Sequence, residues 1–327
     1  MALNNPQLER EVLEGILSGL ANAPGDYIAD QAVPMTPTRF GKGSIAVLSA
    51  GSQFGLAGET GFRLPGGEVS VGPGAGFGTV SYDIELYDRA ERIPYELAKR
   101  SQIPVPLLQL YLSQAVNFLR VGRESRLANV ITSTTWASNN ALAGGNIWST
   151  STSDPIKDIS DAVDSIRGGR PNAMIMGRAT WNTLRTNSAV LDALKTTADR
   201  ALLSKDAFAE AVASHYNIPA DRVFIGRAQK LTTNNPEDAN DPTALADIHG
   251  DYFWVGQIGS AGVPVDDSSD LLMAPTAIAR VQESDLMDNF NQYRQDSHRS
   301  WVVETGIGEH IVAVTTGLGA KITNTVA

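Results

Sequence analysis

The chain has 327 residues, a formal net charge of −10 and no cysteine. The missing cysteines exclude disulfides, thiolate catalysis and cysteine-based metal sites, and the acidic balance argues against a sequence-independent DNA binder, which needs a cationic surface. With 42% hydrophobic residues the composition is ordinary, and we expect neither a secretory signal nor a membrane span, which needs ~20 apolar residues in a row.

The N-terminal region is predicted to be a short helix followed by an arm. Asn5 can cap a helix over residues 5–20, and its apolar residues recur on one face. Pro34 and Pro37 then oppose helix formation. We therefore expect an extended arm there rather than a folded domain.

Residues 40–85 are predicted to form a long β-hairpin with a glycine-rich tip. Twelve of the 30 glycines lie between Gly41 and Gly78, and glycine buries no side chain. The stretch GSIAVLSA is the expected outgoing strand, and the period-two alternation of TVSYDIELYDRAERIP predicts the returning strand. Because an isolated hairpin is barely stable, we expect support from this chain or from another copy.

Residues 105–132 are predicted to form the longest helix, roughly 40 Å at 1.5 Å per residue. An apolar stripe runs along it and is weakened in the middle by Gly122 and Arg123. Arg120 and Glu124 stand four residues apart, so we expect them to form a surface ion pair.

Residues 155–230 alternate helix and strand and predict a compact α/β unit. Asp154 and Pro155 begin one helix, and Gly168 follows its end. The stretch 232–247 is expected to be a surface loop. Further strands are predicted in YFWVGQIG, TAIARVQ, HRSWVVETGIG and EHIVAVTTG, which makes the whole chain α+β.

We find no residues arranged for catalysis, cofactor binding or metal binding. FGKGS lacks the spacing of a phosphate loop, and GPGAGFG lacks the dinucleotide fingerprint. His215, His249, His298 and His310 are interpreted as structural or surface histidines. RPNAMIMGRATWNTLRTN has a strand, a turn and a helix, but Gly177 and Arg178 stand where a nucleophile elbow needs Ser or Cys. Trp181, Leu184 and Leu191 fall at helical spacing and are expected in the core.

The order of these elements resembles the major capsid proteins of tailed bacteriophages, whose fold is named after phage Hong Kong ninety-seven. The stretches that carry the likeness are YIADQAVPM, YDRAERIPYELA, RESRLANVITSTTW, WSTSTSDPIKDISDAVDSIR with RPNAMIMGRATWNTLRTN, and LLMAPTAIARV followed by WVVETGIGEH. They are similar to the prophage-type members, and the likeness covers almost the whole chain.

The resemblance implies a structural protein that assembles as pentamers and hexamers into an icosahedral shell around double-stranded DNA. It implies five regions: an N-terminal helix and arm (1–37), an extended loop (38–85), a peripheral domain with a spine helix (86–154), an axial domain (155–264) and returning C-terminal strands (265–327). The implied partners are further copies of the chain, a portal protein, a scaffolding protein and a decoration protein. The implied location is the virion, after assembly in the bacterial cytoplasm.

The residues expected at contacts between copies come from the loop and from the strand that follows it. They are Phe54, Phe62, Arg63, Phe77, Arg89, Glu91 and Arg92. Because the arm begins close to residue 1, we expect a separate scaffold protein and no large cleaved segment. Lys42 is the only lysine in the loop region and sits at its base, so we expect no covalent crosslinking.

Two alternatives stay open at this point. An encapsulin-type shell that encloses enzyme cargo has the same fold, and cargo would distinguish it from a phage capsid. A small α/β enzyme or ligand-binding protein would need a site in residues 155–230.

Overall fold

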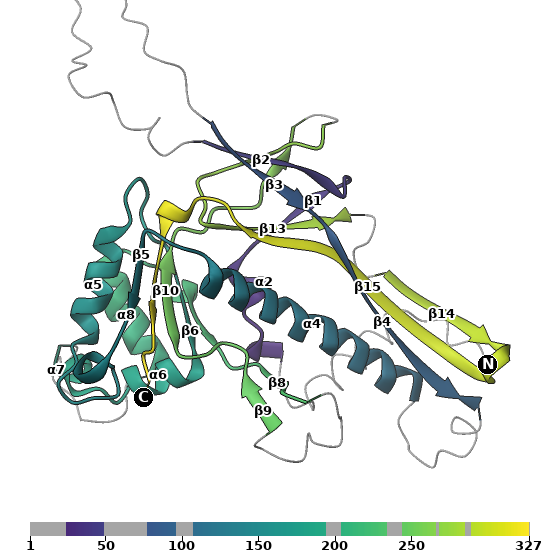
Figure 1. The fold of residues 1–327 in the computed structure, drawn as a ribbon, viewed down its shortest axis with the longest axis horizontal. Coiled ribbons are helices and arrows are strands. Elements are labelled where there is room, and N and C mark those ends of the chain that lie inside the picture. The colour runs from purple at the N-terminus through teal and green to yellow at the C-terminus, as the bar shows by residue number, and fades with distance from the viewer. Residues whose placement is uncertain are drawn as a thin grey trace, which may run out of the picture.

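A computed structural model of the chain describes residues 24–48, 77–95, 107–193, 204–233, 244–265, 268–284 and 289–326. The expected helix over 5–20 and the glycine-rich tip of the hairpin lie outside these residues. Figure 1 shows an elongated molecule, with a block of helices around a sheet at one end and a ribbon of long strands beside a long helix at the other.

The long helix α4 (Leu107–Ser133) runs diagonally from the ribbon to the block (Figure 1). Its predicted apolar stripe is confirmed, because Ala115, Leu119, Leu127 and Ile131 are all buried. The prediction that Glu124 forms a surface ion pair with Arg120 is wrong, because Glu124 is buried and only 1% exposed. Glu124 points toward the core, where buried partners replace the solvent-facing arginine.

One five-stranded sheet builds the ribbon and its continuation. Its members are β1 (Met35–Thr38), β4 (Glu85–Pro94), β13 (Ile278–Glu283), β14 (Asn289–Gln295) and β15 (Ser300–Ala313). Strand β15 pairs with β4 along one edge and with β14 and then β13 along the other. The two strands expected over HRSWVVETGIG and EHIVAVTTG are therefore one continuous strand, and β14 was not predicted.

The hairpin begins with β2 (Lys42–Leu48) and returns with β3 (Phe77–Asp83), paired antiparallel as expected. The expected returning strand is too long, because the chain changes sheets at Ile84 and continues as β4. Support for the hairpin comes from the same chain: β12 (Leu271–Met273) pairs with β2, and β11 (Val263–Pro264) pairs with β12.

The arm is not extended throughout. It contains a 3₁₀ turn (η1, Pro24–Asp26), a short helix (α2, Ala29–Ala32) and strand β1, which pairs in parallel with β13. Ala29 and Ala32 of α2 are 1% exposed. Burial of this face against the core explains why a helical turn forms just before the prolines.

The block is built on a second sheet in the order β5 (Ser138–Ala141), β16 (Gly319–Thr323), β10 (Tyr252–Gly256), β6 (Ala173–Gly177) and β7 (Val223–Gly226). Its helices are α5 (Pro155–Ser165), α6 (Arg178–Leu184), α7 (Ser188–Ala193) and α8 (Lys205–Tyr216). The predicted cap of α5 is confirmed, because Asp154 accepts a hydrogen bond from the Lys157 backbone N–H at 3.1 Å.

The core of the block is aromatic and apolar. Every residue of β6 and β10 is buried, and the rings of Trp136 and Trp254 meet edge to face with centroids 5.6 Å apart. Trp181 and Leu184 of α6 are buried, as expected, whereas Leu191 of α7 is only partly buried. The expected loop 232–247 is wrong at its end, where β9 (Leu245–Asp247) pairs with β8 (Gln229–Leu231).

The final strand ties the block to α4. Strand β16 lies between β5 and β10, and its Lys321 ammonium donates hydrogen bonds to the Thr132 and Thr134 carbonyls at the end of α4, the second at 2.9 Å. A cation at a helix C-terminus offsets the unpaired carbonyls there. Among the described helices, none is long and apolar enough to cross a bilayer.

Candidate intersubunit surface and arm junction

Strand β4 presents the predicted contact residues on two different faces. Arg89 lies opposite Thr305 of β15, Glu91 opposite Val303, and Arg92 opposite Val302. Side chains alternate across a strand, so Arg89 and Glu91 share one face and Arg92 takes the other. Helix α4 covers the Arg89 face, because its Phe118 ring lies 4.7 Å from the Arg89 guanidinium.

Arg89 and Glu91 have partners within their own chain. The Arg89 Nε donates to a Glu91 carboxylate oxygen at 2.7 Å, and the same guanidinium stacks over Phe118, which is 54% exposed. These two residues therefore fix the outer edge of the ribbon against α4. They are available to a neighbour only through their remaining exposed surface.

Arg92 lies on the open face of the ribbon, away from α4. It is exposed, and no partner for it is found among the described residues. By register, Tyr293 of β14 and Leu86 of β4 belong to the same face, with 41% and 61% of their surfaces exposed. We call these three residues the ribbon face. These exposed side chains lie on the face of the ribbon that α4 leaves open.

The sequence prediction missed two members of the ribbon face. The period-two alternation places Leu86 with the buried residues of the hairpin, and only the change of sheet at Ile84 exposes it. Tyr293 lies on β14, which was not predicted. Of the other expected contact residues, Phe77 begins β3 opposite Leu48, whereas Phe54, Phe62 and Arg63 lie outside the described residues.

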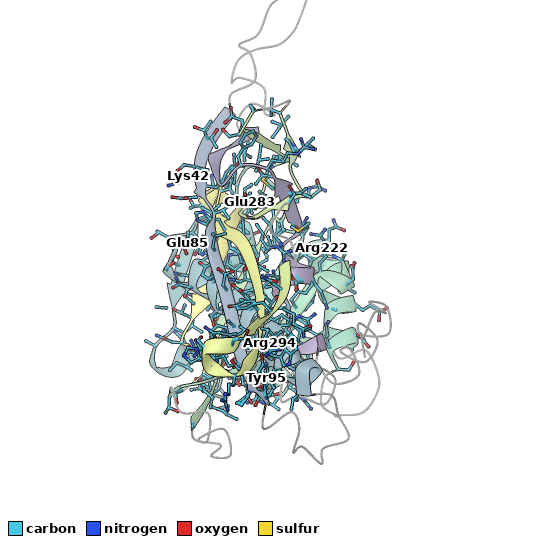
Figure 2. The ribbon with its side chains drawn as sticks, turned by 90° about the vertical axis from the view of Figure 1, so that its right-hand side faces the viewer. Lys42, Glu85, Tyr95, Arg222, Glu283 and Arg294 are labelled. Atoms are coloured by element: carbon cyan, nitrogen blue, oxygen red, sulfur yellow. The ribbon has the colours of Figure 1, made fainter. Side chains whose placement is uncertain are left out.

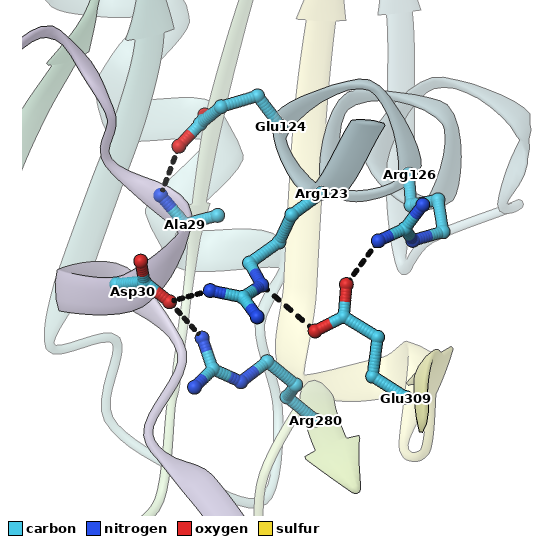
Figure 3. A network of polar contacts seen from close by, with 7 residues as sticks. All are labelled: Ala29, Asp30, Arg123, Glu124, Arg126, Arg280 and Glu309. Atoms are coloured by element: carbon cyan, nitrogen blue, oxygen red, sulfur yellow. Dashed lines mark hydrogen bonds and ion pairs between the residues drawn. The ribbon is translucent and has the colours of Figure 1, made fainter. Parts of the chain in front are cut away.

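An ionic network joins the arm to α4 and to the large sheet, and it runs from the partly exposed Asp30 to the buried Glu309 (Figure 3). Arg123 of α4 donates to Asp30 of the arm and to Glu309 of β15, each at 2.7 Å. Arg280 of β13 also binds Asp30, and Arg126 of α4 binds the second oxygen of Glu309. We call these five residues the arm latch. Glu309 is fully buried, so its charge depends on both arginines.

The pKa of Asp30 is lowered from its ordinary value. Burial opposes ionisation, but the positive charges of Arg123 and Arg280 outweigh it. The same contacts raise the pKa of Arg123: burial lowers it, and the charges of Glu309 and Asp30 more than compensate. The Asp30–Arg123 pair is therefore charged on both sides at neutral pH.

A second buried cluster lies beside the latch. One carboxylate oxygen of Glu124 accepts the Ala29 backbone N–H at 2.7 Å, and the other lies 2.7 Å from His249 Nε2. His249 Nδ1 lies 2.5 Å from the Tyr252 hydroxyl. Burial and the nearby Glu124 charge raise the pKa of Tyr252 far above its ordinary value. A neutral imidazole protonated on Nε2 satisfies both contacts, which agrees with the prediction of a structural His249.

Two grooves are found on the surface of the described residues. A groove of about 500 Å³ is lined by Pro37, Thr38, Arg39, Phe40, Pro264, Ser268 and Ser284. Another of about 480 Å³ is lined by Trp148, Ser149, Thr150, Ser151, Asn182, Thr183, Thr186, Asn187 and Ser188. Neither places a general acid beside a base. Nor does this part of the chain gather three or more acidic or histidine side chains around a metal position.

Comparison with known proteins identifies the architecture. Residues 134–219 match the family described as phage major capsid protein E. The major capsid protein of Burkholderia phage BcepMu is 28% identical over 127 residues, which are 35% of this chain and 39% of that protein. The chain thus spans well under half the length of this relative.

The structural matches cover nearly the whole chain. A phage-related protein from Bordetella bronchiseptica superposes with a TM-score of 0.65 at 16% identity, over 96% of this chain and 97% of that one. The capsid of cyanophage P-SCSP1u gives 0.52 at 8% identity, over 93% and 90%. The chain has the Hong Kong ninety-seven capsid fold.

The same fold is also found in an encapsulin. The holo-SrpI encapsulin complex of Synechococcus elongatus gives a TM-score of 0.53 at 9% identity, over 99% of this chain and 96% of that one. The predicted resemblance to phage major capsid proteins and the predicted fold are confirmed.

Proposed function

We propose that the protein is a phage major capsid protein, whose copies assemble as pentamers and hexamers into an icosahedral shell around double-stranded DNA. The main support is the capsid fold over nearly the whole chain, together with the major capsid protein match in the block. The role is structural and involves no catalysis. The acidic net charge of −10 suits a wall that releases its DNA.

We assign the regions of the shell subunit from the fold. The block would be the axial domain near the five- and six-fold axes, α4 the spine of the peripheral domain, and the hairpin the extended loop over an adjacent copy. The ribbon face would meet a neighbouring copy through Arg92, with Phe54, Phe62, Arg63 and Phe77 of the loop region and the exposed parts of Arg89 and Glu91. A heterologous contact of this kind closes rings.

The proposal includes partners beyond the chain itself. A portal protein, a scaffolding protein and a decoration protein would complete the particle, and assembly would take place in the bacterial cytoplasm. Co-purification of the assembled particles, followed by identification of the bound proteins, tests this part.

Electron microscopy of the purified full chain, alone and co-expressed with its neighbouring genes, tests the function. Closed icosahedral particles or rings of five and six copies are expected. Nuclease-protected DNA in particles made during infection supports the phage assignment. A chain that stays monomeric under all assembly conditions would refute the shell function.

An encapsulin-type shell is the second candidate, because the SrpI encapsulin shares the fold over nearly its whole length. Particles that enclose a co-expressed enzyme and exclude DNA would favour it. Mass spectrometry of the particle contents separates the two functions.

A further inference from the structure

The ribbon at the far end of the molecule has two outer edges. Strands β4 and β14 both flank β15, and neither pairs with any other described strand. In an antiparallel sheet, every second residue of such an edge strand points its N–H and C=O away from the sheet. Figure 2 views the molecule from this end, where the Arg294 guanidinium of β14 lies 5.1 Å from the Tyr95 ring.

The β4 edge carries the features that discourage strand pairing. Charges of both signs line this edge, and the strand ends at Pro94. The charged residues are Glu85, Asp88, Arg89, Glu91 and Arg92. Charged side chains and proline are the usual protection of sheet edges against another chain.

The β14 edge carries almost none of this protection. Its sequence is NFNQYRQ, with no proline, no lysine and no acidic residue. The single charge, on Arg294, is paired with Asp296 at 2.5 Å. The strand keeps one-to-one register with β15 from Asn289 to Gln295, so no bulge interrupts it. An unbroken strand of seven residues with this one charge is long enough for a complete strand pairing.

We propose that β14 pairs antiparallel with β14 of a second copy around a two-fold axis. With Gln292 at the axis, Asn291 of each copy lies opposite Tyr293 of the other, and Arg294 lies opposite position 290. No like charges meet in this arrangement, whereas a parallel, in-register pairing would set Arg294 beside Arg294. The self-complementary register is why a second copy is the occupant.

The pairing would join two ribbons into one sheet of six strands, in the order β4-β15-β14-β14-β15-β4. It goes beyond the proposed function, because shell formation can rest on other contacts and because two free copies can pair in the same way. Its failure and the failure of the capsid function are therefore separable.

The cysteine-free chain allows a direct crosslinking test. Facing residues in an antiparallel pair have Cα atoms roughly 4.5–5.5 Å apart, which a disulfide can span. Full-length Gln292→Cys should form a two-chain species on a non-reducing gel after mild oxidation. Ala90→Cys, at an exposed position on β4, is the matched control and should stay a single chain.

The register follows from mixed variants. Asn291→Cys and Tyr293→Cys should crosslink when mixed and not alone. A cysteine scan over 289–295 extends the test to any other register, because a two-fold pairing bridges only positions whose numbers have a constant sum. Absence of bridges throughout the scan, or bridges without a constant sum, would overturn the proposal.

A charge exchange gives an independent measurement. Gln292→Lys and Gln292→Glu should each weaken association between copies by at least about tenfold, because like charges then face each other at the axis. Mixing the two variants should restore it. Shells without this pairing would overturn the inference alone, whereas pairing without shells would refute only the capsid function.

Discussion

At the scale of single residues, the tightest constraint is the glycine that ends β6. A Cβ on Gly177 would lie 1.9 Å from the Gly250 carbonyl oxygen and 2.4 Å from that of His249. These neighbours are backbone atoms, so they cannot swing away. The turn that looks like a nucleophile elbow in sequence is a point of close packing between two chain segments.

We therefore expect Gly177→Ala to destabilise the protein by about 1–3 kcal/mol, the usual cost of overpacking. Gly317→Ala is the control, because nothing lies within 4 Å of its added Cβ. Chemical denaturation monitored by tryptophan fluorescence measures both. Equal midpoints for the two variants would contradict this account.

Glu124 is the residue on which the arm, α4 and the block converge. Glu124→Ala would leave the Ala29 backbone N–H and the Nε2 atom of His249 without their partner. We expect a loss of about 1–3 kcal/mol for each of these two buried groups left unpaired. Glu210→Ala, on the exposed side of α8, should change stability by less than about 0.5 kcal/mol. Thermal melts of both variants provide the comparison.

At the scale of elements, the arm is held by charge. The folded pKa of Asp30 lies below its ordinary value of 3.8, so its stabilising contribution is present above that pH and is lost as the pH falls through the folded pKa. Protection of the arm amides against hydrogen exchange should therefore decrease below about pH 4.

Asp30→Asn tests the charge directly. The arm amides of this variant should be less protected against hydrogen exchange at neutral pH. The loss of protection below about pH 4 should disappear, because position 30 then has no carboxylate to titrate. Asp161→Asn is the control, because its ion pair with Lys157 is exposed on α5 and lies outside the arm. An unchanged pH profile in Asp30→Asn would show that other contacts hold the arm.

The elements also show what the sequence could predict. Helix α4, β6 and the hairpin strands follow from local periodicity and caps, which need no knowledge of distant partners. The division between β3 and β4 does not, because the alternation runs unbroken through Ile84 while the pairing partner changes. Glu124 was misplaced for the same reason: its partner His249 is distant in sequence, so spacing favoured the nearby Arg120.

At the scale of the whole molecule, the open face of the ribbon should matter for assembly and not for folding. Arg92→Ala removes an exposed cation, so we expect its unfolding midpoint to match wild type while the yield of closed particles falls severalfold. Arg89→Ala removes the contacts with Glu91 and Phe118 and should lower the midpoint as well. Light scattering during assembly, paired with thermal melts, separates the two effects. Normal particle yield from Arg92→Ala would remove this face from the interface.

Both large sheets can be completed only after the last part of the chain, which contains β15 and β16, has been synthesised. Strand β15 is the centre of the ribbon sheet, and β16 after it is central to the block, yet both lie beyond residue 299. A ribosome that stalls before that point releases a chain in which neither sheet can close, however complete α4 and the hairpin are. Such incomplete chains lack the paired ribbon through which copies would join. Chains truncated before residue 299 would thus be unable to enter the particle.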